Sequence, residues 1–184
     1  ILVSENYTVI LVEQVTPPPN PERKVTQIVS PSTYMEPETR PDHRYVMCMY
    51  VFGGYQRASK EYHPYIACAY ADLTTGETVV IEPIFTSDCN ALVSEAARLC
   101  TAYTPKEVVV IGDKEIQEIP HFSQFISWLQ SLSICVQNRI DTDHSMFQTI
   151  SYQQAVLRKV YTQTGLYSPI EYVQLEKYPS SVVC

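Results

Sequence analysis

The sequence has few basic residues and no apolar run long enough to cross a bilayer. Lys and Arg number 13 against 20 Asp and Glu, which gives a net charge of −7. Proteins that bind duplex DNA on their own usually carry a positive surplus, because neutralised phosphates supply much of their affinity. A membrane-spanning helix needs about 20 consecutive apolar residues. The sequence therefore argues against an autonomous duplex-binding domain and against a membrane span.

Catalytic motifs are also missing from the sequence. There is no Gly-x-x-x-x-Gly-Lys-Ser/Thr loop to cradle a phosphate and no Gly-x-Ser-x-Gly turn for a nucleophilic serine. The cluster Asp141 to His144 lacks the rest of a calcium-loop pattern and is typical of a polar turn that caps a helix. We expect no catalytic, cofactor-binding or metal-binding residue in this segment. Solvated or capping roles are expected for the four histidines, which fall in predicted loops or at predicted helix starts: His43, His63, His121 and His144.

The six cysteines include no Cys-x-x-Cys pair and no partner histidine at zinc spacing. Cys48 and Cys68 lie in apolar predicted strands, and Cys100 lies on the apolar face of a predicted helix. This pattern favours reduced core thiols of an intracellular protein in a reducing compartment. It does not distinguish nucleus, mitochondrion, cytoplasm and virus factory. A disulfide scaffold and a zinc site are the alternatives.

Hydrophobic residues make up 45% of the chain, enough for a packed core. The β-branched stretch Tyr7 to Val15 predicts a buried strand, and the alternating stretch Arg23 to Ser30 predicts a second strand. Pro31 to His43 holds several prolines and polar residues, which predicts a loop or linker. The sequence therefore places a domain boundary in this proline-rich stretch.

The chain after Arg44 predicts three strands followed by alternating helices and strands. The first three strands are predicted at 44–52, 64–73 and 77–84, separated by a polar loop at 53–63 and a tight turn at 74–77. Helices are predicted from Ser87 or Asp88 to 103, over 121–132, over 153–163 and from Ser168 onward, with strands at 107–111 and 133–140. This order predicts a ribonuclease-H-like α/β fold, whose mixed sheet joins an antiparallel meander to βα units.

That fold raises the hypothesis of a metal-dependent nuclease, in which carboxylates hold two metal ions. Glu95 lies on the first predicted helix of this unit and Asp113 follows its fourth strand, but its first strand has no acid. Asp72 lies beside the tight turn, where Asp is common for hairpin geometry alone. The carboxylate pattern is therefore incomplete, and a nuclease is kept as an alternative.

Three blocks of sequence, in this order, resemble the MutS family of DNA mismatch-repair proteins. The runs 7–14 (YTVILVEQ) and 21–33 (PERKVTQIVSPST) resemble the closing strands of that family's mismatch-recognition domain. The run 65–77 (YIACAYADLTTGE) is similar to the hairpin signature of its connector domain. The predicted helix at 91–103, followed by 104–110 (TPKEVVV), is similar to the next helix and strand. The run Ser168 to Tyr172 resembles the giant-virus and octocoral-mitochondrial branch.

The sequence also departs from the family pattern. Ser32 stands where the family usually has Gly, and 53–63 looks like an insertion in the first hairpin. The Phe-x-Glu element that wedges into a mismatch, the lever and clamp helices and the ATPase are not in these residues. Since the chain begins and ends within apolar stretches, we expect a piece of a longer polypeptide.

The resemblance implies four segments: the C-terminal part of a mismatch-recognition domain at 1–34, a linker at 35–43, a ribonuclease-H-like connector domain at 44–150, and the helical start of the core or lever region at 151–184. It implies a non-catalytic connector that transmits between mismatch-binding and ATPase modules and docks a MutL-type partner. ATP and magnesium would bind in the ATPase domain, and mismatched DNA would bind the parent, a homodimer or heterodimer. A structural or scaffold module derived from MutS is the alternative.

Overall fold

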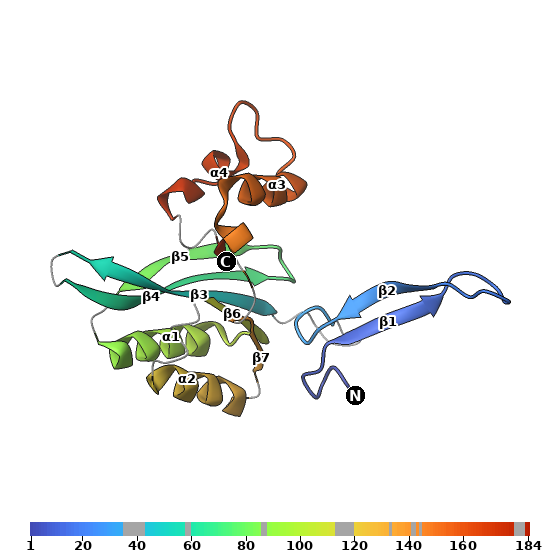
Figure 1. Ribbon diagram of the computed structural model, residues 1–184, viewed down its shortest axis with the longest axis horizontal. Coiled ribbons are helices and arrows are strands. Elements are labelled where there is room, and N and C mark those ends of the chain that lie inside the picture. The colour runs from blue at the N-terminus through green and yellow to red at the C-terminus, as the bar shows by residue number, and fades with distance from the viewer. Residues whose placement is uncertain are drawn as a thin grey trace.

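The computed structural model describes residues 1–34, 43–57, 60–85, 88–112, 120–132, 134–140, 143, 145–178 and 183–184. Strands β1 (Val9–Gln14) and β2 (Arg23–Val29) pair in an antiparallel ribbon. A separate five-stranded sheet has the order β5-β4-β3-β6-β7. The ribbon extends away from the body that holds this larger sheet (Figure 1).

The central sheet combines an antiparallel meander with two parallel strands. Strands β3 (Tyr45–Gln56), β4 (Glu61–Asp72) and β5 (Thr78–Phe85) form the meander. Strand β6 (Glu107–Gly112) runs parallel to β3, and β7 (Cys135–Asn138) runs parallel to β6. The first strand of the unit thus lies at the centre, with the meander on one side and the βα strands on the other. This order is that of a ribonuclease-H-like fold and confirms the predicted α/β class.

Helices α1 (Cys89–Tyr103) and α2 (Pro120–Ser131) cover one face of the central sheet (Figure 1). The main core lies between them and the sheet, where Met47, Val108 and Phe125 are almost fully buried. At about 25 cal/mol per Å² of apolar surface, this burial is the main source of stability. The core therefore joins the sheet to α1 and α2, whose apolar faces the helical periodicity predicts.

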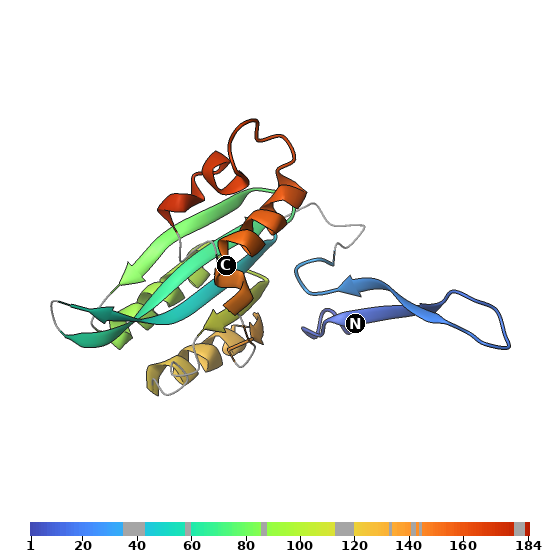
Figure 2. The same ribbon diagram turned by 45° about the horizontal axis from the view of Figure 1, so that its top comes forward.

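The C-terminal segment lies on the opposite face of the sheet. It comprises the 3-10 turn η2 (Ser145–Gln148), helix α3 (Ile150–Val160), helix α4 (Pro169–Tyr172) and the 3-10 turn η3 (Leu175–Lys177). Figure 2 shows α3 crossing this face of the strands. Helix α3 has no buried residue. Helix α3 is therefore packed much less tightly than α1 and α2, whereas α4 buries Pro169 and Ile170.

Several local predictions are confirmed. Gly76 has φ of 77° in the turn between β4 and β5, as the tight hairpin requires. Asp88 caps α1 by accepting a hydrogen bond from the Asn90 amide at 2.9 Å, whereas Ser87 lies outside the described residues. Ser168 and Glu171 form a reciprocal capping box at the start of α4.

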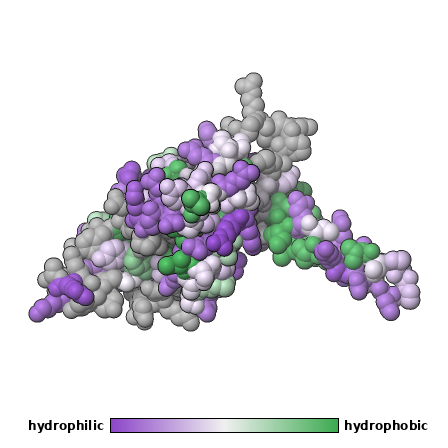
Figure 3. Space-filling model, turned by 90° about the horizontal axis from the view of Figure 1, so that it is seen from above, coloured by the Kyte–Doolittle hydropathy of each residue, from purple (hydrophilic) through white to green (hydrophobic). Residues whose placement is uncertain are grey.

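Two predictions about strands are wrong. Residues 53–56 and 61–63, expected in a polar loop, belong to β3 and β4 and lengthen the hairpin that these strands form. The cross-strand ladder continues because backbone pairing does not require apolar side chains. Strand β1 was expected to be buried, but Ile10 and Val12 are 57% and 52% exposed. A two-stranded ribbon has no second layer over it, and apolar residues line its surface in Figure 3.

The boundary predicted at 35–43 lies outside the described residues except for His43. No helix within the described ranges is long and apolar enough to span a bilayer. The four-segment division of the chain stays a prediction.

Candidate functional site

The turn between β4 and β5 is organised by the buried carboxylate of Asp72, which is 1% exposed. One oxygen accepts hydrogen bonds from the backbone amides of Arg44 at 3.1 Å and Thr74 at 2.9 Å. The other lies 2.7 Å from Nδ1 of His43 and 2.9 Å from the Thr75 hydroxyl. Asp72 therefore joins the start of β3 to the hairpin turn.

These contacts favour the ionised form of Asp72. The hydrogen bond with His43, followed by those from the turn and from Arg44, holds the pKa of the carboxyl well below its usual range, against the opposing effect of burial. A carboxylate with four donors has little capacity left to bind a metal ion or to act as a base. The geometry supports the prediction that Asp72 shapes the hairpin, and it adds the tie to β3.

The His43 side chain is 67% exposed, in line with the solvated position expected from the sequence, and it also makes specific contacts. Its ring stacks on Tyr45, with centroids 5.7 Å apart and an interplanar angle of 5°. Tyr45 in turn meets Tyr70 and Tyr103 edge-on. Burial and the hydrogen bond with Tyr103 raise the pKa of Tyr70, so the Tyr70 hydroxyl stays protonated at neutral pH. The rings belong to a packed cluster at the start of β3 that joins the sheet to the end of α1.

The acids considered for a nuclease do not come together among the described residues. Glu95 pairs with Arg98 at 2.5 Å on the exposed side of α1, and this pair lowers the pKa of the Glu95 carboxyl. Asp72 is held at the hairpin, and Asp113 lies outside the described residues. Within the described ranges, no group of three or more His, Cys, Asp or Glu side chains is placed to hold a metal ion.

The remaining predicted polar positions are partly described. His63 lies on β4 rather than in a loop and is 7% exposed. His121 lies in the first turn of α2, close to the helix start at which it was expected, while His144, Asp141 and Thr142 lie outside the described residues. Asp143 accepts a hydrogen bond from the Ser145 amide at 3.0 Å, which fits the predicted cap at the start of η2.

The cysteines of the core behave as small apolar residues. Cys68 and Cys100 are buried in the main core and, with Cys48, Cys135 and Cys184, are free thiols. Burial raises the pKa of Cys68, and it raises the pKa of Cys100 to about 12. Thiols with so little thiolate are poor nucleophiles and poor metal ligands.

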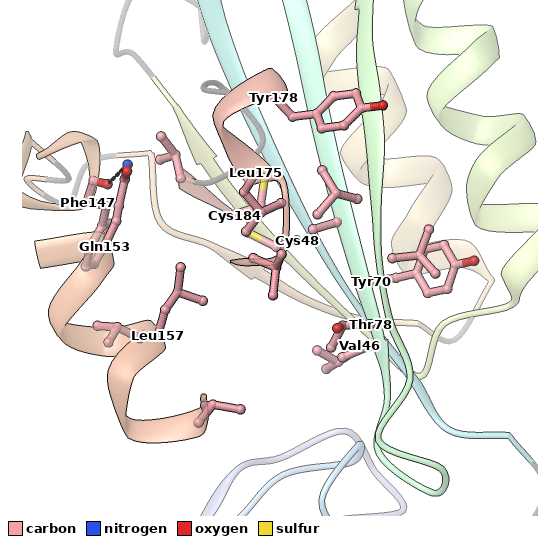
Figure 4. A pocket seen from close by; sticks show the side chains of 18 of the residues that line it. Val46, Cys48, Tyr70, Thr78, Phe147, Gln153, Leu157, Leu175, Tyr178 and Cys184 are labelled. Carbon is pink, nitrogen blue, oxygen red and sulfur yellow. Dashed lines mark hydrogen bonds between the residues drawn. The ribbon is translucent and has the colours of Figure 1, made fainter. Parts of the chain in front are cut away.

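A cavity of about 990 Å³ lies between the central sheet and the C-terminal segment. Val46 and Cys48 line it from the sheet, and Leu157 lines it from α3 (Figure 4). Cys184 projects into the same space. The C-terminal segment therefore covers this face of the sheet without filling the space beneath it. The sequence did not lead us to predict this cavity, although β3 and β4 carry apolar side chains on both of their faces.

Sequence reasoning also missed the burial of Glu107 at the start of β6, where the side chain is 4% exposed. A signal was present, because this acid directly precedes the wholly apolar run Val108 to Ile111. An acid at the head of a central strand is buried with the strand and must find hydrogen-bond donors.

Comparisons with known proteins give weak similarities. No family model matches the sequence, and no curated protein matches it. Among solved structures, the Ppx/GppA family member of Aquifex aeolicus is similar at 10% identity and a TM-score of 0.34. The match covers 63% of this chain and 40% of the Aquifex chain. The chain thus spans 40% of the length of that protein. The fowlpox virus Holliday junction resolvase is similar at 17% identity and a TM-score of 0.36. That match covers 74% of this chain and 90% of the resolvase chain. The fold assignment therefore rests on the strand order.

Proposed function

We propose that this chain is the non-catalytic connector of a MutS-like DNA mismatch-repair protein, together with the end of its mismatch-recognition domain. One observation supports the proposal: the resembling blocks of sequence fall on secondary-structure elements in the order that the resemblance implies. The first block covers the β1–β2 ribbon, the second covers β4 from Tyr65 onward and its turn, and the third covers most of α1 and of β6.

The architecture suits a part that transmits motion. The main core fixes α1, α2 and five strands in one body, while the ribbon leaves it at one end and the C-terminal segment covers the other face. Rigid-body displacement about hinges is a common way to couple distant modules. In this proposal the body moves as a solid piece between mismatch-binding and ATPase modules and presents a docking surface to a MutL-type partner.

Docking is tested by titrating a MutL-type protein against the native parent, with and without ATP. The expected result is a complex that forms only with ATP and is lost when residues 44–150 are replaced by a connector from an unrelated MutS. A replacement that leaves partner binding unchanged contradicts the docking role, and mismatch binding by the same variant serves as the folding control.

A metal-dependent nuclease is the second candidate, because the strand order is that of a ribonuclease-H-like fold. A nicking assay with magnesium or manganese decides between the two. We expect no nicking of linear, mismatched or branched DNA. Metal-dependent nicking that disappears in both the Asp72→Asn and the Asp113→Asn variant would contradict the connector proposal and support a nuclease.

A structural or scaffold module derived from MutS is the third candidate. It differs from the connector in having no ATPase segment in the native polypeptide. Purifying the native protein and testing it for ATP hydrolysis separates these two roles.

A further inference from the structure

The chain attaches the ribbon to the central sheet through a compact turn at the end of β2. The Ser30 amide donates to the Thr33 hydroxyl at 2.7 Å, and the Ser30 carbonyl accepts from the Tyr34 amide at 2.9 Å. The turn points Ser32 toward the body, where this side chain is 2% exposed. Ser32 is thus a buried hydroxyl at the base of a largely exposed ribbon.

The hydroxyl of Ser32 donates to Oε2 of Glu107 at 2.5 Å. The other carboxylate oxygen, Oε1, accepts a hydrogen bond from the Gln137 side chain on β7. One buried carboxylate therefore bridges the ribbon, β6 and β7.

No Lys or Arg in the described part of the chain forms an ion pair with Glu107. The hydrogen bonds that compensate for the burial of this side chain therefore come from neutral donors. A buried carboxylate that loses a donor incurs a desolvation cost. Since Gln137 belongs to the same sheet as Glu107, the donor from outside the sheet is Ser32. The contact therefore resists displacement of the ribbon more strongly than an exposed contact would.

Two other polar contacts join the residues before and after the ribbon to the body. The Cys135 thiol lies 3.6 Å from the Asn6 carbonyl, and the Arg44 guanidinium donates to the Tyr34 carbonyl at an exposed site. Among the ribbon's apolar residues, Val29 at the end of β2 is buried, whereas Ile10 and Val12 face solvent. Among the described side chains, Ser32 and Glu107 form a fully buried polar contact between ribbon and body.

We propose that Ser32 and Glu107 form an orientation lock that fixes the direction of the β1–β2 ribbon relative to the central sheet. Both are positioning residues. The lock goes beyond the connector function and does not depend on it.

Residual dipolar couplings of backbone amides in the 184-residue chain test the lock, because they report orientation separately from stability. In the unmodified chain, the couplings of β1, β2 and the central sheet should fit one alignment tensor. In Ser32→Ala, the alignment magnitude of the ribbon should fall to about half that of the sheet or less, as expected when one part moves independently. The couplings of the sheet itself should not change.

Two further variants complete the test. Ser94→Ala removes a hydroxyl that donates to the Asn90 carbonyl within α1 and should leave ribbon and sheet on one tensor. Glu107→Gln keeps a side-chain oxygen and adds a donor, so it should retain the common tensor. The proposal is overturned if the unmodified chain needs two tensors, if Ser32→Ala keeps one, or if Ser94→Ala has the same effect as Ser32→Ala.

Discussion

At the scale of single residues, two acidic residues of this chain have structural roles that could not be predicted from their positions in the sequence. The Asp72 carboxylate accepts hydrogen bonds from the residues at the start of β3 and from the turn that follows β4. The Glu107 carboxylate accepts hydrogen bonds from Ser32 after the ribbon and from Gln137 on β7. In a ribonuclease-H-like fold, acids on the central strands invite a catalytic interpretation. The hydrogen-bond donors around these two carboxylates tie them to neighbouring elements of the fold.

Asp72→Asn should lower the melting temperature by several degrees at neutral pH, because the amide cannot accept all four hydrogen bonds. The folded-state pKa of Asp72 is depressed, so its stabilising contribution is present above the unfolded pKa of about 4 and is lost as pH falls further. Thermal melts of both forms from pH 7 to pH 2 check this. The difference between them should narrow below about pH 4.

Glu95→Gln is the matched control for that series, since Glu95 is paired only with Arg98 at the surface and exposed pairs contribute little. A constant difference between Asp72→Asn and the unmodified chain across the whole pH range would contradict the role assigned to the ionised carboxylate.

Gly112 ends β6 where β3 approaches closely, and an added Cβ would collide with the Val51 carbonyl oxygen. Gly112→Ala should therefore destabilise the fold by about 2 kcal/mol or more, as overpacking against backbone does. Gly76→Ala is the comparison, because no atom lies within 4 Å of the added Cβ and only the positive φ of 77° opposes it. It should cost about 1 kcal/mol. Denaturant unfolding measures both, and equal costs would contradict the close approach.

At the scale of elements, the sequence predicted the existence and order of the strands and helices better than their lengths. The apolar periodicity of Leu92, Ala96 and Leu99 located α1, and Gly76 located the hairpin turn. The β3–β4 hairpin was predicted too short, because its outer half is polar and glycine-containing and gives no alternation. The exposure of β1 was not predictable, since a β-branched apolar run looks the same whether or not another layer covers it.

Helix α3 should exchange its amide hydrogens much faster than α1. It has no buried residue and borders the cavity, whereas α1 buries Leu92, Ala96 and Leu99 against the sheet. Local opening free energies follow such differences in packing. Hydrogen exchange followed by mass spectrometry checks this prediction. Equal protection of the two helices would mean that the C-terminal segment is packed as firmly as the main core.

At the scale of the whole molecule, the sequence alone predicted the α/β class and the ribonuclease-H-like strand order. It could not predict the joints between the parts, because Ser32 and Glu107 are 75 residues apart in the chain. Such contacts depend on how the ribbon meets the sheet, which no local pattern encodes. These contacts matter for the proposed function, since a connector can transmit a movement only if its contacts with the neighbouring parts are rigid.

The native polypeptide that contains this chain offers the most direct test of the connector function. Peptide mapping of the purified native protein, aligned to its transcript, would reveal the residues on both sides. We predict a Phe-x-Glu element upstream and a Gly-x-x-x-x-Gly-Lys-Ser/Thr loop several hundred residues downstream. A native polypeptide that lacks both elements would contradict the assignment of this chain to a mismatch-repair ATPase.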